Sequence, residues 1–145
     1  MEKLESLLKN YARRKWARWW LGERPDGRDS HMARIIAGKV DYPTAAEDPF
    51  ANNGIVALDR MQAAHVLAVA GTTGLAYGRP VLREERRKEA AEALRDLGEG
   101  ASFFSNGLWR DGHRSWWPLS SATFDCGVIG YDDRNAFIFW VEEED

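Results

Sequence analysis

The sequence is poor in cysteine and has no long hydrophobic run. Cys126 is the single cysteine among 145 residues, so a disulfide within the chain is impossible and a reducing cytosol is the expected environment. No stretch approaches the ~20 apolar residues of a membrane-spanning helix, and the mean hydropathy is -0.51. The first residues are charged throughout, without the apolar segment of a secretory signal. We therefore expect a cytoplasmic protein that does not enter the membrane.

The recognised signatures of catalysis and cofactor binding are also missing. The sequence contains no GxxxxGK[ST], GxGxxG, HExxH, CxxC or GxSxG pattern. Its acidic residues are consecutive at the C-terminus rather than convergent, and no two histidines have the spacing of metal ligands. The sequence thus predicts no cofactor, no metal site, no catalytic residues and a protein that is not an enzyme.

Aromatic residues, and tryptophan above all, are abundant. The chain has seven tryptophans, whereas roughly two would be expected at average composition. Hydrophobic residues make up 44% and charged residues 30%, as in ordinary globular proteins. A chain of this length can bury about two thirds of its unfolded surface. We expect a single domain over residues 1–145.

The first hundred residues have the character of helices. Segments rich in helix-forming residues, with apolar side chains at helical spacing, are separated by glycine, proline and asparagine. The predicted helices are Glu2 to Leu21, His31 to Val40, Ala57 to Ala70, and a last one from Pro80 at its first position to Gly98 at its C-terminal cap.

Beyond Gly100 the sequence is typical of strands. Aromatic and β-branched runs alternate with Gly, Asn, Asp and Ser, and a four-residue connection beginning at Asp132 joins the last two runs as a β-hairpin. Both faces of the last run are apolar, so we expect it to be covered on both sides. The predicted fold class is α+β, with residues 1–100 mainly helical and packed on a small antiparallel sheet from residues 101–145.

Charge is distributed unevenly and suggests a binding surface. Residues 1–40 hold ten Lys or Arg against five Asp or Glu, whereas residues 41–145 hold ten against eighteen. Either a basic segment docks on an acidic domain, or the acidic end meets a basic protein partner. Tryptophans next to acidic residues suit an interface because Trp is enriched in binding hot spots. The candidate partner-binding residues are Trp116, Trp117, Asp132, Asp133, Glu142, Glu143 and Glu144.

Two alternatives of a different class remain open. His113 lies near Asp111 and Arg114, a combination that could supply general acid–base chemistry on phosphate esters. The segment YARRKWARWW in the first predicted helix mixes cations with tryptophan, which would suit phosphate contacts and base stacking. The net charge of -3 argues against nucleic acid as the partner.

Residues 116–145 resemble the C-terminal regions of bacterial toxin immunity proteins from polymorphic and secreted-effector toxin systems. The resemblance rests on the ATFD-x-G strand, from Ala122 through Thr123, Phe124 and Asp125 to Gly127, and on the WVEEED ending. It implies a non-enzymatic cytosolic inhibitor that binds a cognate toxin tightly through an acidic surface. The oligomeric state stays open.

Overall fold

The chain forms a five-stranded antiparallel sheet with helices on both faces. The computed structural model describes residues 1–14, 16–75, 82–109 and 117–144. The elements in chain order are α1 (Glu2–Arg14), β1 (Ala17–Glu23), α2 (Asp29–Gly38), β2 (Val56–Leu58), α3 (Arg60–Thr72), α4 (Glu84–Leu94), β3 (Ser102–Ser105), β4 (Phe124–Tyr131) and β5 (Asn135–Glu143). The α+β class predicted from the sequence is confirmed.

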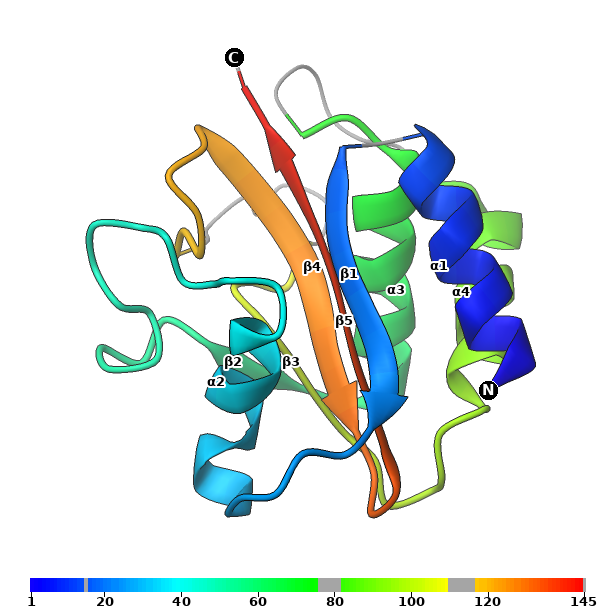
Figure 1. The fold of residues 1–145 in the computed structure, drawn as a ribbon. Helices are drawn as coiled ribbons and strands as arrows, with labels where there is room; N and C mark the ends of the chain where they lie inside the picture. The colour runs from blue at the N-terminus through cyan, green and yellow to red at the C-terminus, as the bar shows by residue number, and fades with distance from the viewer. Residues whose placement is uncertain (15, 76–81, 110–116, 145) are drawn as a thin grey trace.

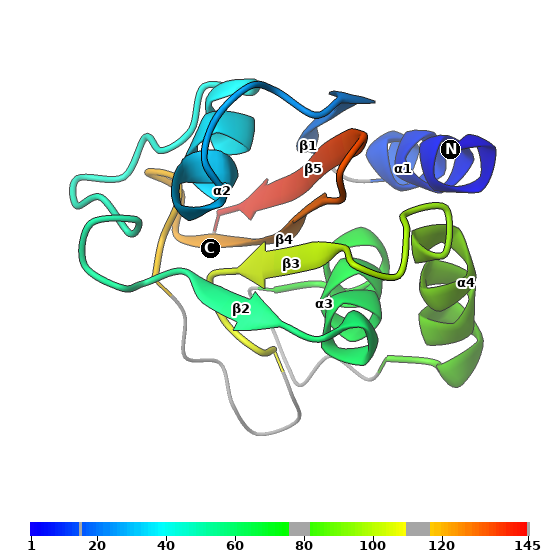
Figure 2. The ribbon, with the colours of Figure 1, turned by 90° about the horizontal axis from the view of Figure 1, so that it is seen from below.

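The sheet brings the two ends of the chain together. Its strand order is β1-β5-β4-β3-β2, so β1, from the N-terminal region, pairs with β5 at the C-terminus. The predicted hairpin is formed by β4 and β5, and Tyr131 faces Ala136 at its closed end. Helices α1, α3 and α4 cover one face and α2 covers the other (Figure 1 and Figure 2). The sheet is therefore buried on both sides.

Alternate residues of β5 enter two separate cores. Phe137 and Phe139 join the core beneath α1, α3 and α4, whereas Ile138 and Trp140 join the core beneath α2. All four are completely buried. The expectation that the last strand is covered on both faces is confirmed, and β5 lies between β1 and β4 as a central strand.

The first predicted helix is shorter than expected. The helix ends at Arg14, and Ala17–Glu23 forms strand β1. Side chains of β1 alternate between the two cores, with Trp19 and Leu21 on the α1 side and Trp20 on the α2 side. Helix propensity is a weak preference, and pairing with β5 along seven residues outweighs it here. The prediction of a continuous helix from Glu2 to Leu21 was therefore wrong after Arg14.

Other helix boundaries need smaller corrections. The predicted helix from Ala57 starts instead at Arg60, because residues 56–58 form strand β2 and Asp59 caps the helix. The Asp59 side chain accepts the Gln62 N–H while the Gln62 side chain accepts the Asp59 N–H, a capping box that is visible in the sequence. Residues 1–100 are thus less uniformly helical than predicted, since they supply two strands of the sheet.

The second and the fourth predicted helices differ in how well they match the structure. Helix α2 matches the expected helix from His31 to Val40 within two residues at each end. Helix α4 ends at Leu94 with Arg95 as its cap residue, so Gly98 is not the C-terminal cap. Pro80 lies outside the described residues. No helix in the described ranges has the length and apolar character to cross a membrane.

We predict that Gly71→Ala will loosen the docking of α1. A Cβ at position 71 would lie 2.2 Å from the Tyr11 ring, which is itself packed against Phe139 with ring centroids 5.6 Å apart. Overpacking of this kind should lower the free energy of unfolding in urea by about 2 kcal/mol. Gly38→Ala is the matched control, since nothing lies within 4 Å of a Cβ there. Equal stability of the two variants would contradict this account of the α1–α3 contact.

Candidate protein-binding loop

The acidic residues proposed from the sequence lie at opposite ends of β5. Asp132 and Asp133 follow β4 at the closed end of the hairpin, and Glu142, Glu143 and Glu144 lie at the C-terminal end. Eight residues, 134–141, lie between Asp133 and Glu142, and most of them are extended strand, so the two groups are roughly 30 Å apart. The structure therefore does not bring all five carboxylates together in one surface.

Asp132 organises the hairpin turn. One carboxylate oxygen accepts the N–H groups of Arg134 and Asn135 at 2.8 and 2.7 Å, and the other accepts the Gly98 N–H at 2.9 Å. Partial burial alone would raise the pKa of Asp132, but these backbone donors outweigh it and hold the pKa below its ordinary value. Asp133, in contrast, is exposed. Of these two acids, Asp133 is the one whose side chain faces solvent.

Glu142 joins β5 to β1 and to the segment after α2. Its carboxylate accepts the Tyr42 hydroxyl at 2.5 Å and lies 3.4 Å from the Arg18 Nε. The Arg18 guanidinium also donates to the Val40 carbonyl and stacks over the Tyr42 ring at 4.5 Å. Burial, and next the contact with Glu142, raise the pKa of Tyr42 far above its ordinary value, so its hydroxyl stays a donor. Glu142 thus serves the fold, in agreement with the alternative that basic and acidic parts of the chain attract each other.

The next two glutamates also hold neighbouring backbone. Glu143 is partly buried and accepts the Leu75 N–H at 2.9 Å. Glu144 is exposed and accepts the Thr123 hydroxyl at 2.7 Å. Glu144 therefore lies beside the segment of residues 117–123 that leads into β4, and we call this segment the Trp117 loop.

A buried carboxylate holds the Trp117 loop in place. Asp125 is completely inaccessible to solvent. Its oxygens accept Trp140 Nε1 at 2.8 Å, Ser120 Oγ at 2.9 Å, Asn106 Nδ2 at 3.0 Å, and the N–H groups of Leu119 and Ser120 at 3.1 and 3.2 Å. Burial raises the pKa of Asp125, and the bonds from Trp140, Leu119 and Ser120 act in the opposite direction. The indole, the Asn106 amide NH2 and the two backbone N–H groups can only donate, so this set of partners favours the ionised carboxylate as their acceptor.

Asn106 extends this network to the start of the loop. Its amide donates to the Trp117 carbonyl at 2.9 Å, and the Trp117 N–H donates to the Asn106 carbonyl at 3.1 Å. The backbone of Trp117 is fixed, yet 46% of its surface remains exposed. Pro118 and Ser121 are exposed beside it. The loop thus presents an indole to solvent on a backbone tied to the core.

The remaining candidates occupy different positions. Trp116, Asp111, His113 and Arg114 lie outside the described residues. Cys126 is buried in β4, as the sequence predicts for a small core side chain. The Nε2 of partly buried His65 lies 2.8 Å from the Trp109 carbonyl, which fits a boundary residue. Among the described residues, no group of three His, Cys, Asp or Glu side chains could hold a metal ion.

The mixed array of cations and tryptophans expected on the first helix is broken up. Trp16 is 62% exposed after the helix, whereas Trp19 and Trp20 are half-buried on opposite faces of β1. Arg18 is engaged by Glu142 and Val40. These side chains therefore do not share the continuous helical surface on which the nucleic-acid alternative depended. The exposure of Trp16 was missed because the sequence placed it within a helix.

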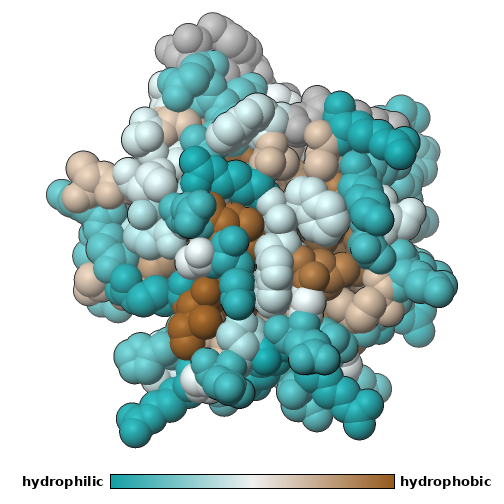
Figure 3. Space-filling view, in the orientation of Figure 1, coloured by the Kyte–Doolittle hydropathy of each residue, from teal (hydrophilic) through white to brown (hydrophobic). Residues whose placement is uncertain are grey.

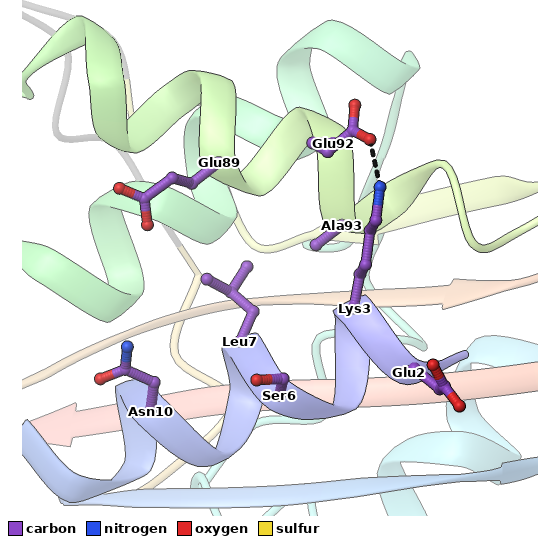
Figure 4. Close-up of a pocket in the computed structure, with 8 residues that line it drawn as sticks. All are labelled: Glu2, Lys3, Ser6, Leu7, Asn10, Glu89, Glu92 and Ala93. Carbon is purple, nitrogen blue, oxygen red and sulfur yellow. Dashed lines mark hydrogen bonds and ion pairs between the residues drawn. The ribbon is translucent and has the colours of Figure 1, made fainter.

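The groove between α1 and α4 has a volume of about 440 Å³. Its lining is formed by Glu2, Lys3, Ser6, Leu7, Asn10, Glu89, Glu92 and Ala93. Lys3 Nζ bonds Glu92 at 2.5 Å across it (Figure 4), and this contact lowers the pKa of Glu92. Both partners are half exposed or more. The groove is an open seam between two helices that an exposed ion pair bridges.

Comparisons with known proteins identify no relative: no family model, curated protein or solved structure matches the chain.

We predict that Asp125→Asn will release the Trp117 loop and destabilise the fold. The amide NH2 would face N–H and O–H donors, so at least one buried donor loses its acceptor, at a cost of about 3 kcal/mol in the free energy of unfolding. Amide exchange at Leu119 and Ser120 should also accelerate, because both N–H groups bond Asp125. The matched control is Asp133→Asn at an exposed site. Unchanged exchange at Leu119 and Ser120 in Asp125→Asn would refute the anchoring role.

We predict that Asp132 contributes to the loss of stability in acid. The pKa of Asp132 in the folded protein lies below its ordinary value. Its contribution to the free energy of unfolding is therefore complete above the unfolded pKa of about 3.9, and it is lost as the pH falls through the folded pKa. Urea unfolding between about pH 5 and pH 2 should therefore show a shallower loss of stability for Asp132→Asn than for the unmodified protein. Asp133→Asn is again the control. If the unmodified protein and both variants lose stability identically as the pH falls, Asp132 makes no such contribution.

Proposed function

We propose that the protein is a non-enzymatic binding protein that neutralises a cognate toxin, with the Trp117 loop as its main contact surface. The observation that carries the proposal is the burial of the Asp125 carboxylate beneath this loop. Removing a carboxylate from water is costly, and here it serves to fix the backbone of an exposed loop. A loop that is ordered before binding loses less conformational entropy on association.

The side chains on the loop suit a protein partner. Trp117 offers a large indole on a fixed backbone, which is the usual character of an interface anchor. Glu144 lies at the other end of the loop through its bond to Thr123, and Glu143 is its neighbour. The exposed carboxylate of Glu144 at the end of this loop favours a basic partner surface, such as the nucleic-acid-binding or catalytic face of a toxin. Glu142 is not part of this surface, because Tyr42 and Arg18 engage it.

The similarity of residues 116–145 to immunity proteins supports the same proposal from the sequence. It includes Asp125 and the strand that positions it. The structural role of Asp125 also gives a physical reason for an acid at this place in the motif, since it holds the preceding loop. The similarity and the geometry thus both point to residues 117–125.

The proposal is tested by capturing the partner from native cells and measuring its affinity for purified variants. Trp117→Ala should weaken binding at least about tenfold, whereas Trp16→Ala, a matched change at another exposed tryptophan, should leave it nearly unchanged. Reversing Glu144 to lysine should slow association, and the difference should shrink at high salt.

A second measurement separates toxin neutralisation from binding alone. Co-expression with the captured protein should relieve its toxicity, and Trp117→Ala should lose this protection. A captured protein that is not toxic would overturn the immunity assignment. Equal affinity of the Trp117→Ala variant and the unmodified protein would overturn the role of the loop.

A further inference from the structure

Strand β1 is a long, uncovered edge of the sheet. Within the described residues it pairs only with β5, along seven residues, whereas the opposite edge strand β2 has three residues. Figure 1 looks onto the β1 edge, and neither α1 nor α2 lies in front of it. Edge strands of this length expose unpaired backbone groups that can accept another strand.

The register identifies the backbone groups that point outward. The Arg24 N–H donates to the Arg134 carbonyl. These two residues are the next pair beyond Glu23 and Asn135, where the β1–β5 pairing ends. In an antiparallel pair, hydrogen-bonded positions alternate with positions whose N–H and C=O point away. Residues with even numbers in β1 therefore bond β5, and Trp19 and Leu21 direct their N–H and C=O toward the open edge.

The two faces beside this edge differ in character. On one face Trp19 and Leu21 pack partly buried against the core beneath α1. On the other face Lys39 Nζ lies 5.3 Å from the centre of the Trp20 ring, and Arg18 is partly exposed. Figure 3 shows pale and brown surface down the middle of the same view, with teal side chains on either side. An incoming strand would meet an apolar face and a cationic face.

This asymmetry favours a foreign acidic strand over a second copy of the chain. Two copies could pair their β1 strands antiparallel through the outward N–H and C=O groups. Three registers are then available, in which Trp20 of one copy lies opposite Trp20, Arg18 or Gly22 of the other. The register in which Trp20 faces Trp20 brings Lys39 of one copy close to Lys39 of the other, since Lys39 lies over Trp20. Arg18 and Arg24 are already paired with Glu142 and Asp29 within each copy. Like charges opposed across a strand pair are destabilising.

We propose that the β1 edge takes up an extended segment of another protein as a sixth strand. The segment would alternate acidic residues, which face Lys39, with apolar residues, which face Trp19 and Leu21. Main-chain hydrogen bonds to Trp19 and Leu21 supply affinity, and the alternating side chains supply selectivity. This inference concerns a surface apart from the Trp117 loop and does not rest on the proposed toxin neutralisation.

The test uses a synthetic heptapeptide of alternating glutamate and valine, blocked at both ends. In the expected pairing the valines lie opposite Trp19 and Leu21, so their N–H groups bond β1 and the glutamate N–H groups face solvent. A peptide N-methylated on its valines should bind at least about tenfold more weakly than one N-methylated on its glutamates. The amide signals of Trp19 and Leu21 in NMR spectra should shift when the unmodified peptide binds.

Charge selectivity is tested with the same peptides and two protein variants. The lysine–valine counterpart should bind at least about tenfold more weakly, and Lys39→Glu should weaken binding of the glutamate peptide severalfold. Lys88→Glu on α4 is the matched control and should bind as the unmodified protein does. Equal binding of the two N-methylated peptides, or no binding at millimolar peptide, would overturn the proposal. A dimer in sedimentation that Leu21→Pro abolishes would assign the edge to a second copy and would also overturn it.

Discussion

The carboxylate of Asp125 connects the hydrophobic core to the surface of this protein. It accepts the indole N–H of Trp140 from the central strand and two backbone N–H groups from the Trp117 loop. A single buried acid therefore fixes both a core side chain and the start of an exposed loop. Such an arrangement requires every donor to be present, because a partly satisfied buried carboxylate would be very unfavourable. These bonds hold the Trp117 loop in a fixed position relative to β4 and β5.

The second constraint is the meeting of the two chain ends. Strand β1 pairs with β5, and the Arg18–Glu142–Tyr42 contacts lie at the C-terminal end of that pair. In the sequence the basic and acidic regions look like separate binding surfaces. In the structure some of these opposite charges pair with each other within the fold. Among the described residues, the surface that remains is more local: an indole and the Glu144 carboxylate at the Trp117 loop, and the β1 edge with Lys39 on one face. These two surfaces suit partners of opposite charge.

Sequence reasoning succeeded where a pattern depended on local chemistry. The hairpin around Asp132 was predicted because turn-forming residues separate two apolar runs, and the burial of both faces of β5 followed from its uninterrupted apolar character. Trp117 was proposed as an interface anchor because tryptophan is enriched in binding hot spots; the structure shows it 46% exposed, and its binding role stays a prediction. The role of Asp125 was not foreseen, since its donors come from residues 106 to 140, which only the folded chain brings together.

The sequence by itself determined the α+β class, the C-terminal hairpin, the buried strand β5 and the impossibility of a disulfide within the chain, because each follows from residue type and short spacing. Tertiary structure alone decided that the chain turns from helix to strand after Arg14, since pairing with β5 outweighs the helix propensity of Ala17 to Leu21. It also decided which acids face solvent. Glu142 and Asp132 are similar to their neighbours in sequence, and contacts with distant residues, Tyr42 for Glu142 and Gly98 for Asp132, give them structural roles. The strand pairing after Arg14 and the solvent exposure of each acid depend on long-range contacts, which short sequence patterns cannot predict.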